Sequence, residues 1–183
     1  MGLFSRKPKQ RSWEDVCVDL SELLEKSRQS FFQAAVGAVR ESGTVVPNAT
    51  LEGDGDLALR AYQLEVVSAF VGRQGYVAEE DLEKFDSLIL DRIGGEDADK
   101  CMDYVHRYYV QTGEANVKLL NDLIRFISGA PEIDVSIVAG LRIRELIFST
   151  DAQIVAAAVF GDDKLAGELR SRTETAMPNL DRY

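Results

Sequence analysis

Apolar residues recur at helical spacing along most of the chain, and glycines interrupt the pattern at intervals. Apolar positions three and four residues apart lie on one face of an α-helix. The interruptions fall near Gly72, Gly94, Gly113, Gly129 and Gly161, and glycine is the residue that most readily adopts the left-handed conformation that ends a helix. The pattern predicts an all-α fold, a compact multi-helix bundle of about seven helices with a long N-terminal helix and short glycine-rich turns.

The longest predicted helix begins at Ser12 and ends near Glu41. Ser12 with Asp15 three residues later fits a capping box, and Ser42-Gly43 supplies a stop. Its apolar stripe contains Trp13, Val16, Cys17, Leu20, Leu23, Leu24 and Phe31. Any part of this stripe that the rest of the chain leaves uncovered would offer a surface for a partner or a second copy.

A loop is expected at 44–55, with Asp56 as the N-cap of a second helix that is apolar over most of its circumference and therefore central. Further helices are expected from about Glu79 to Gly94, from Asp97 to Gly113 and from Glu114 to Ser128. The third begins with an acidic first turn, which suits the positive end of the helix dipole.

The stretch 134–148 permits either a helix or a strand, because short apolar runs are ambiguous by periodicity alone. A helix is preferred, since the sequence offers no partner strand. Thr150 and Gln153 fit a second capping box, so a separate helix is expected from there to Gly161. A last short helix is expected from Asp163 to Arg172.

A chain of 183 residues fits one domain. No apolar run approaches the ~18 residues of a membrane span, and the first residues lack the apolar segment of a secretory signal. Cys17 and Cys101 fall on apolar stripes and are interpreted as reduced core thiols. We therefore expect a cytoplasmic protein with a flexible basic tail at 1–11 and a single helical domain at 12–183.

Charge is unevenly distributed around a net value of −10. The first eleven residues contain four basic side chains and no acid, so the remainder is strongly acidic. An acidic body disfavours nucleic acid, whereas a basic tail gains about 1 kcal/mol per cation near an anionic membrane. The alternatives are a solubilising disordered tail and a tail that folds back onto the acidic body. The candidate membrane or partner contacts are Leu3, Phe4, Arg6, Lys7, Lys9 and Arg11.

Candidate catalytic and metal-binding residues are few. His106 is the only histidine, and with Asp103 it forms one Asp-x-x-His pair, whereas a carboxylate-bridged di-metal site needs two such pairs and further carboxylates. Cys101 and His106 lie about 140° apart around a helix, so they do not form a nucleophile–base pair. No catalytic residue, metal site or cofactor is predicted.

Residues 57–90 resemble, faintly, the tellurite-resistance TerB family of helical domains, in which an Asp-Gly turn follows one helix and a glutamate opens the next. Here Gln74-Gly75 occupies the turn and Glu80 matches the glutamate. Because Gln74 stands where the family has aspartate, the resemblance does not carry over a metal site.

These observations favour a non-enzymatic helical interaction or adaptor protein with a protein partner, recruited weakly to a membrane surface by its tail. Self-association through the first helix is a further expectation. One alternative is an enzyme or a small-molecule- or metal-binding protein with a site between helices; another is a component of a larger assembly. The acids weighed for such a site are Glu65, Glu80, Asp86, Asp103 and Glu145.

Overall fold

The computed structural model describes residues 11–46, 49–109, 115–129 and 135–176, apart from the side chains of 106–109, 115–120, 135, 138, 143 and 176. Every regular element in these ranges is a helix, which confirms the all-α class. In chain order these are α1 (Trp13–Glu41), α2 (Gly53–Gln74), α3 (Glu79–Gly94), the 3-10 helix η1 (Gly95–Asp97), α4 (Ala98–Tyr109), α5 (Ala115–Ser128), α6 (Val135–Val159) and α7 (Asp163–Ala176).

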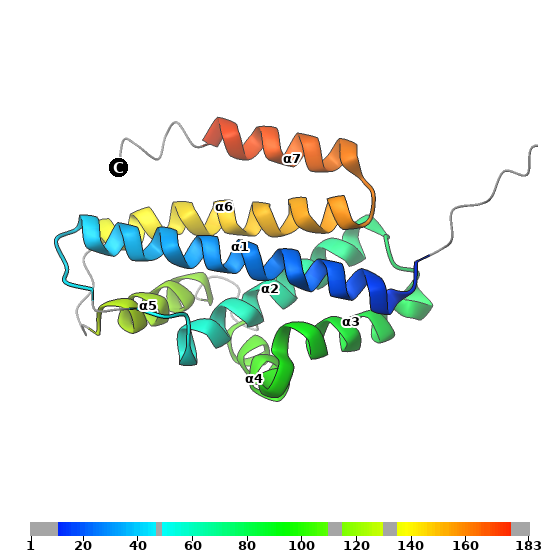
Figure 1. Ribbon diagram of the computed structural model, residues 1–183, viewed down its shortest axis with the longest axis horizontal. Coiled ribbons are helices and arrows are strands. Elements are labelled where there is room, and N and C mark those ends of the chain that lie inside the picture. The colour runs from blue at the N-terminus through cyan, green and yellow to red at the C-terminus, as the bar shows by residue number, and fades with distance from the viewer. Residues whose placement is uncertain (1–10, 47–48, 110–114, 130–134, 177–183) are drawn as a thin grey trace, which may run out of the picture.

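The two longest helices, α1 and α6, lie side by side and antiparallel through the middle of the molecule (Figure 1). Helix α7 packs against α6 on one side, and α2, α3, α4 and α5 lie on the other side. The aromatic pair Phe31 and Phe148 joins the middle of α1 to α6, with tilted rings whose centroids are 4.7 Å apart. The middle layer is thus covered by helices on both sides.

Helix α1 begins as predicted. The Ser12 hydroxyl accepts a hydrogen bond from the backbone N–H of Asp15 at 3.1 Å, so the cap is confirmed. Leu20, Leu24 and Phe31 of its stripe are buried within the same chain, and Trp13 packs edge-on against Phe85. The stripe therefore stabilises this fold and does not form an open surface, apart from Leu23, which is 37% exposed.

The start of α2 corrects the sequence prediction. The helix begins at Gly53, with Glu52 at the N-cap, so Asp56 lies inside the first turns and is not a cap. Gly55 lies inside the helix, and a Cβ there would lie 3.1 Å from the ring of Phe126, so the close approach favours glycine at this position. The glycines interpreted as loop residues instead let the helix start close to α5.

The second correction concerns α6, which is one continuous helix where a break was predicted at Thr150. The Thr150 hydroxyl donates to the carbonyl of Leu146 at 2.8 Å, so it bonds within the helix and does not cap a new one. The helix interpretation of 135–148 is correct. Helix α7 continues past Arg172 to Ala176, and the stop predicted at Gly113 lies outside the described residues.

Two apolar clusters fill the interior, one at each end of α1. The Trp13 cluster contains Leu20 and Leu24 with parts of α2, α3, α6 and α7. The Phe148 cluster contains Phe31 and Phe32 with parts of α2, α5 and α6. Arg28 lies between the two clusters along α1, and Gln63 lies between them along α2. Both side chains are buried. A polar layer therefore separates the two clusters.

Candidate functional site

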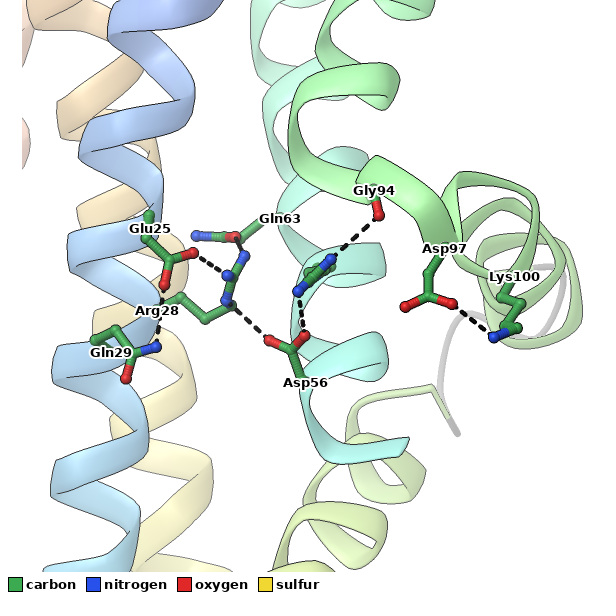
Figure 2. A network of polar contacts seen from close by, with 9 residues as sticks. Glu25, Arg28, Gln29, Asp56, Gln63, Gly94, Asp97 and Lys100 are labelled. Carbon is green, nitrogen blue, oxygen red and sulfur yellow. Dashed lines mark hydrogen bonds and ion pairs between the residues drawn. The ribbon is translucent and has the colours of Figure 1, made fainter. Parts of the chain in front are cut away.

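The polar layer is centred on Arg28, which has only 6% of its surface exposed. Its Nε lies 3.2 Å from Oδ1 of Asp56 on α2, and its Nη1 donates to Oε1 of Gln63 at 3.3 Å. Its Nη2 donates to the Glu25 carboxylate one turn earlier on α1. Figure 2 shows Arg28 reaching from α1 toward Asp56 and Gln63. The guanidinium is therefore contacted from three directions, by two hydrogen bonds and by one ion pair in which Nε makes no hydrogen bond.

Asp56 extends this network to α3. Its Oδ2 lies 2.6 Å from Nη2 of Arg60, and Nη1 of Arg60 donates to the Gly94 carbonyl at 3.1 Å. One carboxylate thus sits between two guanidinium groups, and the chain of contacts links α1, α2 and the end of α3. Burial lowers the pKa of Arg28 and the charge of Asp56 raises it; arginine nevertheless remains charged at neutral pH.

A pocket of about 470 Å³ opens beside this network. Helix α1 supplies Glu22, Glu25, Lys26 and Arg28, α2 supplies Arg60, and α3 with η1 supplies Arg92, Ile93 and Gly95. Four of these side chains are cationic and two are acidic. Arg28 and Arg60 are tied by ion pairs, whereas Lys26 and Arg92 are exposed. The pocket therefore combines fixed cations at its base with exposed cations at its edge.

Glu145, one of the acids singled out from the sequence, is 3% exposed on α6, and its Oε1 has no hydrogen-bond partner among the described residues. Burial raises its pKa, which a hydrogen bond from the Tyr62 hydroxyl and the charge of Arg142 oppose. Burial also raises the pKa of Tyr62 to about 12. Burial therefore favours the protonated form of this carboxyl relative to a carboxyl in water.

None of the remaining predicted acids is fully buried. Asp86 is exposed and accepts a hydrogen bond from Ser68 at 2.9 Å. Glu80 and Asp103 are exposed and Glu65 is half-buried. Among the described residues no group of three or more histidine, cysteine or acidic side chains is placed to hold a metal ion.

Of the six predicted tail contacts, Arg11 lies within the described residues. Arg11 is exposed and forms an ion pair with Asp19 at 2.5 Å. Leu3, Phe4, Arg6, Lys7 and Lys9 lie outside the described residues, as does the side chain of His106.

Cys17 and Cys101 are fully buried free thiols. Burial raises the pKa of each to about 11. Both therefore stay protonated at neutral pH, and a protonated thiol is a poor nucleophile.

The turn that resembles the TerB family is explained by helix-capping geometry. Gly75 adopts φ +64 and closes α2, with its N–H bonded to the carbonyl of Val71 at 3.0 Å. Glu80 lies exposed in the first turn of α3. Both residues serve the helix ends that they flank.

Comparisons with protein-family models, with curated proteins and with solved structures find no match to this chain. In the described part of the chain no helix is both long and apolar enough to cross a membrane.

The sequence reasoning missed Arg28, Asp56, Arg60 and Arg92. One signal was available: Arg28 stands four residues after Leu24 and three before Phe31, on the stripe that the prediction treated as apolar. A charged residue at such a position needs a buried partner. A second signal was the spacing of Asp56 and Arg60, one helical turn apart.

Proposed function

We propose that this chain is a cytoplasmic, non-enzymatic helical interaction protein, an adaptor that receives part of a partner protein in the pocket between α1, α2 and α3. The observation that carries the proposal is the fixed pair of guanidinium groups at the base of an open pocket. Side chains already locked in place lose little further entropy when a partner binds, which favours recognition.

The chemistry of the pocket suits binding better than catalysis. Arginine does not exchange its proton near neutral pH, so Arg28, Arg60 and Arg92 are poor general acids or bases. Arg60 and Arg92 are good donors of directed hydrogen bonds, whereas Arg28 already contacts Asp56, Gln63 and Glu25. The pocket also offers Ile93 as an apolar contact beside the charges, and such a mixture is typical of a site that receives a protein side chain.

Selection of displayed peptides against the full chain, followed by chemical-shift mapping, tests this proposal. Ser21→Trp fills the pocket with a bulky side chain and should abolish binding of the selected peptides. Ser30→Trp is the matched control, because Ser30 is exposed on the same helix and does not line the pocket. Peptides that map elsewhere, or that bind the Ser21→Trp protein unchanged, would contradict the proposal.

Weak recruitment to an anionic membrane surface is a second candidate function, favoured by the four cations at 1–11 on an otherwise acidic chain. The tail should bind vesicles containing phosphatidylserine at low salt and release them at high salt. Flotation of the full chain against a variant with Arg6, Lys7 and Lys9 changed to Gln measures this. Equal flotation of the two proteins would contradict membrane recruitment by the tail.

A further inference from the structure

We infer that the pocket recognises an oxyanion, a carboxylate or phosphate group carried by the partner protein, with Arg92 and Lys26 as its contacts at the edge and Arg60 at the base. The inference rests on the proposed function and names the chemical group that the partner presents. It depends on the balance of charge, on the supply of hydrogen-bond donors and on the arrangement of the three helices.

The charges around the pocket favour an anion. Lys26, Arg28, Arg60 and Arg92 line it against Glu22 and Glu25, and Asp56 lies directly behind. Cations therefore outnumber acids at this place, although the whole chain carries a net charge of −10. A local excess of one sign in a protein of the opposite sign focuses ions of the complementary charge.

The hydrogen-bond donors point to the same ligand class. A guanidinium carries five N–H donors and no acceptor. In Arg60, Nη2 contacts Asp56 and Nη1 donates to the Gly94 carbonyl. Its buried Nε has no hydrogen-bond partner among the described residues. Arg92 forms no ion pair within the described part of the chain. Donors in excess of acceptors are best satisfied by a ligand with several charged oxygens.

The residues that line the pocket have two different roles, positioning and ligand contact. Arg28 contacts Asp56, Gln63 and Glu25, although its buried Nε, like that of Arg60, makes no hydrogen bond among the described residues. We assign it the part of a positioning residue that fixes Asp56 and, through it, Arg60. Lys26 on α1 and Arg92 on α3 approach the pocket from different helices. A ligand between them would join α1 to α3 across the pocket.

A protein is a better source of this oxyanion than a membrane. Outside its first eleven residues the chain is strongly acidic, and an acidic surface is repelled by anionic headgroups. A single acidic or phosphorylated side chain can enter the pocket without bringing a charged sheet of lipid against the rest of the molecule.

Titration of the ¹⁵N-labelled full chain with sodium phosphate and with sodium acetate tests the inference, with sodium chloride at equal ionic strength as the control. The backbone amides of Ser21 and Gly95, which line the pocket, should shift and saturate. The Lys26→Ala/Arg92→Ala variant should bind roughly tenfold more weakly or worse, since charge-assisted hydrogen bonds are lost. Arg170→Ala, an exposed arginine on α7, should bind as wild type.

A peptide with one phosphoserine should bind more tightly than free phosphate if the source is a protein. Equal affinity of the two would assign the site to a free anion and overturn that part of the inference. Shifts no larger than those with chloride, or a double variant that binds as wild type, would overturn the oxyanion itself.

The outcomes also separate this inference from the proposed function. Selected peptides that occupy the pocket without any oxyanion binding would leave the adaptor standing and remove the inference. Oxyanion binding without any peptide that occupies the pocket would contradict the adaptor and favour a binder of small molecules.

Discussion

Arg28 on α1 and Glu145 on α6 are both charged residues buried almost completely inside the bundle, and their surroundings differ. Arg28 has an opposite charge 3.2 Å away in Asp56 and two further polar partners. Glu145 has a hydrogen bond from Tyr62, and its Oε1 has no partner in the described structure. The comparison shows that burial alone does not decide what a charged group does.

A buried charge with a partner becomes part of the framework, because removing either side leaves the other uncompensated. A buried carboxyl without an opposite charge in contact instead shifts its pKa upward and can become neutral. The Arg28 site therefore holds a fixed geometry, which a binding pocket needs. Burial raises the pKa of Glu145, so its charge is expected to change with pH while that of Arg28 does not.

The largest effect should come from Asp56→Ala. It leaves Arg28 and Arg60 facing each other without the carboxylate between them, which should cost about 3–5 kcal/mol of unfolding free energy. Urea denaturation measures this. Asp54→Ala is the matched control, an exposed acid in the same first turn of α2, and should cost less than about 1 kcal/mol. Equal losses in the two variants would contradict the framework role.

Arg28→Met should cost less, about 2 kcal/mol. The methionine fills similar space, and Asp56 keeps Arg60 as its partner at 2.6 Å. The asymmetry between the two sides of one ion pair is the informative quantity. If Arg28→Met destabilises the protein more than Asp56→Ala in the same denaturation experiment, Arg60 does not compensate Asp56 as described.

Glu145→Gln should stabilise the protein at neutral pH by on the order of 1 kcal/mol, since it removes a buried charge that has an unpaired oxygen. The pKa of Glu145 in the folded state is raised above its ordinary 4.5, so native stability is lost as pH rises through that raised pKa. The advantage of Gln should therefore be largest at neutral pH and vanish below about pH 4.5. Unfolding midpoints of wild type and Glu145→Gln across this pH range measure the difference, with the exposed Glu174→Gln as control. A difference that does not change with pH would contradict the prediction.

The smallest effect concerns Gly55, beside Asp56. Ala is preferred over Gly inside a helix by roughly 0.5–1 kcal/mol, and Gly37→Ala on α1 should show that gain because nothing lies within 4 Å of the new Cβ. Gly55→Ala should not show this stabilisation, since its Cβ would lie 3.1 Å from the Phe126 ring. Thermal unfolding of the two variants makes the comparison; an equal gain at both positions would show that Phe126 yields freely.

Local signals predicted the helical elements of the fold. The hydroxyl of Ser12, the glycine at 75 and the acids that open α3 each act on neighbouring backbone, so their effect can be predicted from the sequence alone. The predictions failed at Gly55 and Thr150, where the local signal was outweighed. Close approach to Phe126 on α5 accompanies the first, and a hydrogen bond within α6 accompanies the second.

The candidate site could be predicted only in part. Of the acids named from the sequence, Glu145 is buried and Asp86 is exposed, and neither lines the pocket. The pocket was not foreseen, because Arg28 and Gln63 are separated by 35 positions and Arg92 comes from a third helix. Which charges meet depends on how α1, α2 and α3 pack, and that information is not local in the sequence.

The most direct test is to follow the Nε–H signals of the arginine side chains by NMR while the full chain is titrated with inorganic phosphate. The Arg28 signal should be protected from solvent exchange and stay in place, because the side chain is buried and its Nη1 and Nη2 already donate to Gln63 and Glu25. The Arg92 signal should move and saturate. An Arg28 signal that exchanges like that of an exposed side chain would contradict its fixed position in the network. An Arg92 signal that moves no more than with chloride would contradict oxyanion binding in the pocket.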